Sequence, residues 1–166
     1  NGIHMDRESG LIWSPSHFTW MDTNYPAGTP REGYPVEIQV LWIRLLQQLA
    51  QIEDPVAGKE WQALADRALA SFHQHFWIEE RGYLADLLIA PSGTPAAAAE
   101  VDTALRSNNL FAISLGLIKG EKARRTVQAA AEHLVIPGAL RSLAPLPVEP
   151  PLPIHSAHGE LLNDPN

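Results

Sequence analysis

Residues 35–52 read PVEIQVLWIRLLQQLAQI, and apolar side chains cover nearly every side of the helix that this stretch predicts. The stretch opens with proline, which is favoured at the first position of a helix. Glu37 follows in the first turn, where a carboxylate interacts favourably with the helix dipole. A helix that is apolar all round is buried inside a larger structure. We therefore expect residues 35–52 to be an inner helix.

The rest of the chain repeats this theme. Residues 59–77 carry apolar side chains on one stripe only, which is typical of a surface helix. Residues 108–118 are again apolar almost throughout, and residues 121–135 are again amphipathic. Short turns rich in Gly, Pro and charged residues separate the members of each pair. The pattern predicts two helix hairpins, each with one inner and one outer helix.

A ring of such hairpins is an α/α toroid, so we expect an all-α chain that supplies about two hairpins of one. Between them, residues 82–106 form a long loop with a short strand candidate at residues 83–89. Two hairpins do not close a ring. We therefore expect residues 1–166 to be part of one α/α-barrel catalytic domain, truncated at both ends, with the remainder of that domain as a partner. Long loops at one end of such a ring are where a site would be built.

The composition of the chain disfavours several classes of partner and cofactor. The chain has 166 residues, 45% hydrophobic and 19% charged, and a formal net charge of −7. A negative chain with scattered basic residues disfavours nucleic acid as a partner. No apolar run is long enough to span a membrane. The absence of cysteine excludes thiolate metal sites and suits the cytoplasm, and we expect neither a metal nor a cofactor.

The C-terminal stretch changes character, since seven of the 14 prolines lie between Pro137 and Pro165. A disordered tail and an ordered active-site loop are both compatible with residues 146–166. We favour the ordered loop, because LRSLA at residues 140–144 and the segment 155–166 do not resemble a low-complexity linker.

Residues 9–42 read SGLIWSPSHFTWMDTNYPAGTPREGYPVEIQVLW and hold three of the five tryptophans and two of the three tyrosines. Sugars present flat C–H faces edged with hydroxyl groups. Their binding sites therefore combine aromatic platforms with carboxylate, Arg, Asn or His side chains. The composition of this segment is compatible with a sugar site, although many aromatic side chains in buried loops simply pack.

Three segments resemble the amylo-α-1,6-glucosidases, the glucosidase domains of glycogen debranching enzymes. They are TWMD at residues 19–22 with TPREG and PVEI at residues 29–38, LRSNNLFAISL at residues 105–115, and LRSLA at residues 140–144. Ser107 and Asn109 depart from the family's usual Pro and Gln, which puts sugar contacts from these two positions in doubt. The resemblance implies a glucoamylase-like six-hairpin α/α barrel that removes α-1,6-linked glucose from branched α-glucans with inversion.

The resemblance makes Asp22 the general acid, which protonates the glycosidic oxygen as the bond breaks. Such a role needs a raised carboxyl pKa, and apolar neighbours such as Trp20 and Met21 would disfavour the ionised form. The alternative is a loop aspartate that hydrogen-bonds its own backbone. The family's general base lies beyond Asn166, and neither Glu149 nor Glu160 sits in a matching motif. We therefore expect this stretch alone to be inactive.

Four more residues are candidates for substrate binding, each with a structural alternative. Glu37 could bind glucose hydroxyls or only interact with the helix dipole, and Trp20 could be a sugar platform or a packed side chain. Arg31 could contact a hydroxyl or carboxylate group or be a surface charge. Arg106 could hydrogen-bond substrate or pair with Asp102. With Asp22, these four should converge on one concave face at the same end of the helices.

Two rival functions remain open. The TWMD core indicates glucose more strongly than it indicates the α-1,6 linkage, so a trehalase-like or glucosylglycerate hydrolase is an alternative enzyme. A helical-hairpin interaction module with a packed, Trp-rich loop is the alternative that is not an enzyme.

Overall fold

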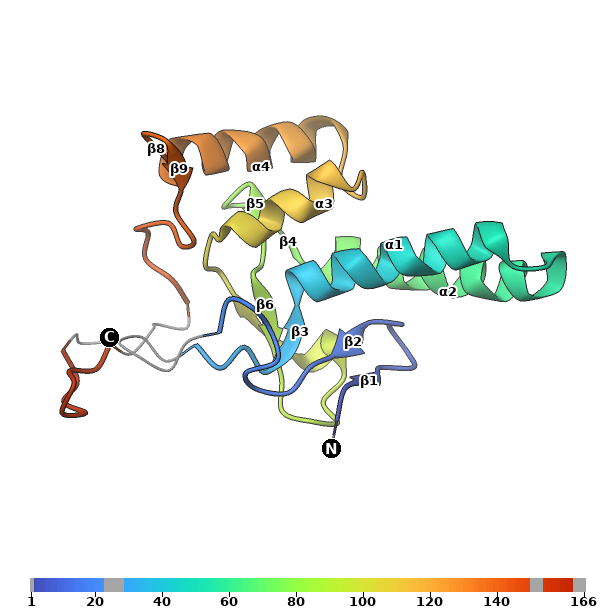
Figure 1. Ribbon diagram of the computed structural model, residues 1–166, viewed down its shortest axis with the longest axis horizontal. Helices are drawn as coiled ribbons and strands as arrows, with labels where there is room; N and C mark the ends of the chain where they lie inside the picture. Colours follow the sequence, from blue (N-terminus) through green and yellow to red (C-terminus); the bar gives the residue numbers. More distant parts are fainter. Residues whose placement is uncertain (1, 23–28, 150–153, 163–166) are drawn as a thin grey trace.

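A computed structural model of the chain describes residues 2–22, 29–149 and 154–162. Its two longest elements, α1 (Val36–Ile52) and α2 (Pro55–His75), lie alongside each other as an antiparallel hairpin (Figure 1). The first predicted hairpin is thus confirmed. Helix α2 begins four residues before the predicted start at residue 59. The reason is local: the Asp54 carboxylate accepts hydrogen bonds from the backbone N–H groups of Val56 and Ala57, and Pro55 takes the first helical position.

The second pair consists of α3 (Leu110–Ser114), preceded by the 3-10 turn η2 (Ser107–Asn109), and α4 (Gly120–His133). The helix predicted over residues 108–118 is therefore much too long. It ends early because Gly116 takes a φ of 73° and donates its N–H to the Ile113 carbonyl, while Leu117 donates to the Ala112 carbonyl. This pair of bonds is the Schellman motif, which satisfies the last carbonyl groups of a helix.

Nine short strands pair in four antiparallel sheets within the described residues. The largest sheet has three strands in the order β3 (Gly33–Pro35), β6 (Leu87–Ile89), β7 (Glu100–Asp102). The others are two-stranded and consist of β1 (His4–Met5) with β2 (Ile12–Trp13), β4 (Trp77–Ile78) with β5 (Tyr83–Leu84), and β8 (Val135–Ile136) with β9 (Ala139–Leu140). A second 3-10 turn, η1 (Ala96–Ala98), precedes β7.

The expected all-α class, a two-hairpin fragment of an α/α toroid, is wrong: the chain is mixed α and β. The strand candidate at residues 83–89 contains two strands, β5 and β6. Other segments were expected to be loops but are buried, as Leu11, Trp13 and Tyr34 illustrate. Buried backbone N–H and C=O groups need hydrogen-bond partners, and these segments supply them to one another as strands. That residues 1–166 are one part of a larger catalytic domain stays a prediction.

The three-stranded sheet joins residues that are far apart in the chain. Gly33 pairs with Ile89 on one side and forms two backbone hydrogen bonds with Ser14 on the other. Gly33 has a φ of 131°, and a Cβ atom there would lie 2.1 Å from the Leu88 carbonyl oxygen. Only glycine fits this position. The glycine of the Arg-Glu-Gly sequence at residues 31–33 is therefore required by the packing of β3 against β6.

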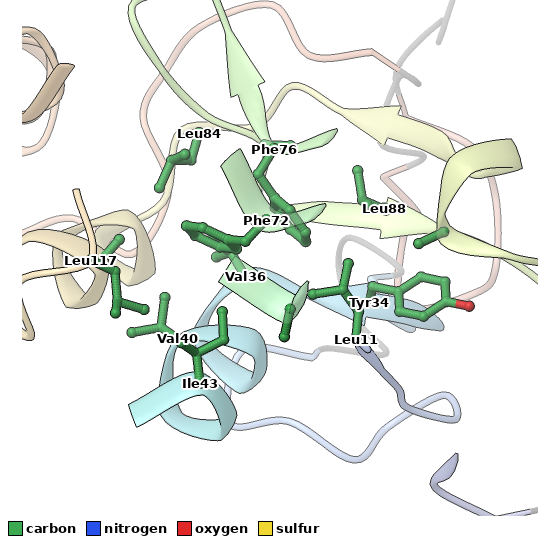
Figure 2. Packing of buried hydrophobic residues seen from close by; sticks show 14 of the residues in the cluster. Leu11, Tyr34, Val36, Val40, Ile43, Phe72, Phe76, Leu84, Leu88 and Leu117 are labelled. Atoms are coloured by element: carbon green, nitrogen blue, oxygen red, sulfur yellow. The ribbon is translucent and has the colours of Figure 1, made fainter. Parts of the chain in front are cut away.

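The main hydrophobic core lies where α1 and α2 meet this sheet. Figure 2 shows Val36, Val40 and Ile43 of α1 facing Phe72 and Phe76, with Leu84, Leu88 and Leu117 around them. Phe72 and Phe76 stack with their ring centroids 4.9 Å apart. The buried side of α2 is a single stripe, as predicted for a surface helix. Helix α1 was predicted to be buried inside a larger structure; in this chain Leu41 and Leu45 on its outer side are 41% and 47% exposed, and burial of that side in a complete domain stays a prediction.

The C-terminal stretch is described in part. Thr103 donates its backbone N–H to the Glu149 carbonyl, and the Glu149 N–H donates to the Thr103 hydroxyl. Residues 154–162 form a turn closed by a bridge between His155 and Leu161. The remainder of the predicted loop, residues 150–153 and 163–166, lies outside the described residues.

Candidate active site

Trp20 and Asp22 lie on a loop whose two ends are tied together. The His17 N–H donates to the Pro30 carbonyl over 2.8 Å, and Ser14 and Gly33 exchange backbone hydrogen bonds just outside that contact. The Ser16 hydroxyl donates to Glu32 Oε2 over 2.7 Å. These bonds fix the base of the loop. Residues 23–28, in its middle, lie outside the described residues.

Trp20 is 56% exposed, yet its indole is held in place. The indole Nε1–H donates to Asn108 Oδ1 over 3.3 Å, and the ring packs against Phe111 with their centroids 5.8 Å apart. The hydrogen bond uses the edge of the ring and leaves a large part of its surface in contact with solvent. An exposed indole with a fixed orientation is suited to pack against the apolar face of a sugar.

Among the described residues, Asp22 contacts His17 on its own loop, and its side chain is partly open to solvent. Its Oδ2 atom lies 2.9 Å from Nδ1 of His17, and its side chain is 17% exposed. His17 has a left-handed φ of 61°, a conformation that non-glycine residues seldom adopt outside turns and functional sites. Within the described residues, no contact joins Asp22 or Trp20 to Arg31, Glu37 or Arg106. The convergence of all five candidates on one concave face therefore stays a prediction.

Arg31, Glu37 and Arg106 do come together, around a fourth residue, Asp86. Arg31 donates from Nη1 to Asp86 Oδ2 over 2.7 Å and from Nη2 to Glu37 Oε2 over 2.6 Å. Arg106 Nε lies 3.1 Å from the same Asp86 oxygen, a close ion pair without the alignment of a hydrogen bond. We call Arg31, Glu37, Asp86 and Arg106 the buried ionic cluster.

The buried ionic cluster is almost closed to solvent. Glu37 and Asp86 are fully buried, and the two arginines are at most 5% exposed. Burial raises the pKa of the Glu37 carboxyl, and the Arg31 charge opposes this effect. Burial also raises the pKa of Asp86, against the opposing charges of both arginines. Two cations facing two carboxylates give the cluster the charge balance that buried ions require.

The cluster also has unused hydrogen-bonding capacity. Glu37 Oε1, Asp86 Oδ1 and Arg31 Nε are buried and have no hydrogen-bond partner among the described residues. Arg31 has a left-handed φ of 54°, so the backbone is strained where the cluster meets the base of the loop. Strain and unpaired polar atoms cost stability, and they concentrate at functional sites.

Asp86, Asn108 and His17 were not among the predicted site residues, and only Asp86 has a signal in the sequence. Asp86 is the one charged residue in the apolar run at residues 83–89, and a buried charge needs an opposite charge nearby. Arg106 was weighed as a partner of Asp102, but the structure pairs it with Asp86. Nothing in the sequence indicated that Asn108 would hold Trp20 or that His17 would face Asp22.

No group of three or more His, Cys, Asp or Glu side chains suited to a metal ion occurs in the part of the chain that the structure describes. None of its helices is both long and apolar enough to cross a membrane.

Comparison with solved structures found similarity to neutral trehalase Nth1 from Saccharomyces cerevisiae. The TM-score is 0.55 at 17% sequence identity, over 68% of this chain and 22% of the trehalase chain. At this identity the likeness concerns the fold alone. The chain spans less than a quarter of the length of that enzyme. A search of curated proteins found no match.

A family model described as amylo-alpha-1,6-glucosidase matches residues 1–149, which include the loop of Trp20 and Asp22, the buried ionic cluster and all three sequence motifs. The match covers well over half of the chain, and the chain therefore belongs to the amylo-α-1,6-glucosidase family, a family of glycoside hydrolases.

Proposed function

We propose that the protein is an inverting glycoside hydrolase that releases α-1,6-linked glucose from branched α-glucans, with Asp22 as the general acid. One observation carries the proposal: a partly exposed carboxyl group and a fixed, exposed indole lie on the same closed loop. Membership of the family supports a glucoside as the substrate. The α-1,6 linkage rests on the family's description alone.

In this proposal Trp20 is the sugar platform. A glucose ring packs its C–H face on the exposed indole, whose orientation is set by Asn108 and Phe111. Asp22, two residues further along the same loop, delivers its proton to the glycosidic oxygen as the bond breaks. The contact with His17 orients the carboxyl group, and the partial exposure of Asp22 gives the substrate access to it.

In this proposal Arg31, Glu37 and Arg106 contribute to substrate binding indirectly, because they stabilise the loop that carries Trp20 and Asp22. They are buried and ion-paired, whereas Trp20 is exposed, so they do not offer a surface to the sugar. Only a rearrangement of the cluster would bring Glu37 Oε1 into contact with a sugar hydroxyl.

Inversion needs a second carboxylate about 6.5–9.5 Å from the acid, with a water molecule between it and the sugar. Glu37 and Asp86 are buried and form ion pairs with Arg31, which makes them poor general bases. We propose that the base comes from another part of the protein, so that residues 1–166 alone are inactive. The cytoplasm remains our predicted location.

The test is the stereochemistry of the first product. The complete protein that contains this chain is incubated with a glycogen limit dextrin, and the released sugar is followed by proton NMR before mutarotation. The proposal predicts glucose that first appears as the β anomer. The α anomer, or no glucose, would overturn it.

A second candidate is hydrolysis of an α,α-linked disaccharide such as trehalose, which the fold likeness to neutral trehalase favours. The same reaction with trehalose in place of dextrin separates the two functions. Glucose from trehalose alone would support the second candidate and contradict the first. The glucosylglycerate alternative stays a prediction without an observation of its own.

A further inference from the structure

The buried ionic cluster is centred on one atom, Asp86 Oδ2, which lies within 3.1 Å of both Arg31 and Arg106. These two arginines belong to the two segments that hold the Trp20 loop. Arg31 is adjacent to the base of the loop, where Pro30 receives the His17 N–H. Arg106 immediately precedes η2, which contains Asn108, the residue that binds the indole of Trp20.

The backbone of Asp86 is itself fixed from two sides. Its N–H donates to the Asp102 carbonyl of β7, and its carbonyl accepts the N–H of Val36 at the start of α1. Asp86 is therefore held by its backbone between β7 and the start of α1. Because the Asp86 carboxylate pairs with both Arg31 and Arg106, it sets the positions of their two segments relative to each other.

The strained backbone at Arg31 is further evidence that the buried ionic cluster positions the loop. A left-handed φ in a non-glycine residue persists only where the surroundings hold it. The Arg31 side chain is 2% exposed, and its two terminal nitrogen atoms are bound by Asp86 and Glu37. The ion pairs thus fix the direction in which the chain leaves the loop.

We infer that Asp86 is a positioning residue. By pairing with both Arg31 and Arg106, it fixes the relative positions of the two segments that hold the loop of Trp20 and Asp22. This inference rests on the proposed function only in that these two residues act on the sugar. Asp86 has no role in the proton transfer itself. Replacing it with the isosteric, neutral Asn should loosen the loop without altering either of the residues proposed to touch the substrate.

The experiment compares Asp86→Asn with Asp102→Asn in the complete protein. Asp102 is a matched control, because it is a buried aspartate on the neighbouring strand whose carboxylate accepts the Ala104 N–H. Within the described residues it forms no ion pair with either arginine. Amide hydrogen exchange is measured for the loop base, including His17 and Gly33, and for α2 as an internal reference.

We expect Asp86→Asn to accelerate exchange at the loop base by about tenfold or more, with α2 unchanged and with the control close to wild type. On limit dextrin, kcat should fall by about tenfold or more and KM should rise, because both Asp22 and Trp20 are displaced. Exchange at the loop base equal to that of the control would overturn the inference.

Two further outcomes are distinguishable. If Asp86→Asn does not fold, Arg31→Lys tests the same support, since an ammonium group cannot span Glu37 and Asp86 as the guanidinium does. Faster exchange at the loop base would then support the inference, and unchanged exchange would overturn it. If the wild-type protein hydrolyses no glucoside, the proposed function fails, and hydrogen exchange alone decides the role of Asp86.

Discussion

Replacing Gly33 with Ala should destabilise the fold far more than the loss of glycine flexibility alone would. The residue combines a φ of 131° with a direct backbone contact, since an added Cβ would lie 2.1 Å from the Leu88 oxygen and 2.8 Å from the Ala90 nitrogen. Both obstacles belong to the backbone of the neighbouring strand segment and cannot rotate away. Strand β3 must therefore move off β6.

The magnitude follows from what that movement breaks. The unfavourable φ costs about 1–2 kcal/mol. Separating β3 from β6 also loses two or three backbone hydrogen bonds, including the one from Ala90 to the Glu32 carbonyl, at about 1 kcal/mol each. We expect Gly33→Ala to lower the free energy of unfolding by about 4 kcal/mol or more.

Gly93→Ala is the matched control. Gly93 also has a positive φ, 87°, but an added Cβ would meet nothing within 4 Å. It should therefore cost only the conformational part, about 1–2 kcal/mol. Urea denaturation of both variants in the complete protein, followed by tryptophan fluorescence, measures the difference. Equal losses for the two variants would show that the packing of β3 on β6 is not as tight as described.

Three further predictions concern the core, the pH dependence and the exposed surface. Phe72→Ala should lower the free energy of unfolding by about 3–5 kcal/mol in urea denaturation, because the ring is fully buried; a loss below about 1 kcal/mol would contradict its place in the core. Burial raises the pKa of Asp102 to about 6 from the ordinary 3.8. The folded state thus binds the proton more tightly, so the Asp102 contribution to stability should fall by roughly 2 kcal/mol as the pH rises from about 4 to about 6.5. Urea denaturation across this range should show Asp102→Asn removing that slope, and an unchanged slope would refute the assignment. The isolated 166-residue chain should bind a hydrophobic dye strongly, because Leu41 and Leu45 are exposed on α1; weak binding with a sharp cooperative melt would argue against this.

The helices could be predicted because their signals are local. The apolar periodicity and the leading proline located α1 to within one residue, and the amphipathic pattern located α4 nearly as well. The length of α3 could not be found in this way. Its end depends on the left-handed turn at Gly116, where the N–H groups of Gly116 and Leu117 donate to the Ile113 and Ala112 carbonyls, although the apolar run continues to Ile118.

The strands could be predicted only in part, because they are two or three residues long and pair over long distances in the chain. The strand candidate at residues 83–89 contains β5 and β6, whereas β3 and β7 were expected to be loop. Gly33 pairs with Ile89, and no alternation of polar and apolar residues precedes either of them. In such a case burial, not propensity, makes the backbone pair. This is why segments that seemed to be loops became sheets and an all-α fold was expected.

The sequence predicted that three of the candidate residues lie close together, but it did not predict how they are arranged; their role in a site stays a prediction. Arg31, Glu37 and Arg106 were expected to meet and do meet, but as a buried ionic cluster organised by Asp86 and not as an open sugar-binding surface. The sequence shows which side chains carry charge. It does not show which of them solvent can reach, and this accessibility depends on the tertiary packing of the sheet.

The proposed role of Asp22 can be tested directly by measuring Asp22→Asn in the complete protein on limit dextrin and on α-glucosyl fluoride. The amide keeps the shape of the carboxyl group and cannot donate an acidic proton. Loss of general acid catalysis should slow glucose release from dextrin by about 10²–10⁴-fold. Departure of fluoride needs little protonation, so the loss on glucosyl fluoride should be much smaller. A rate on dextrin within about threefold of wild type, or equal losses on both substrates, would contradict the assignment of Asp22 as the proton donor.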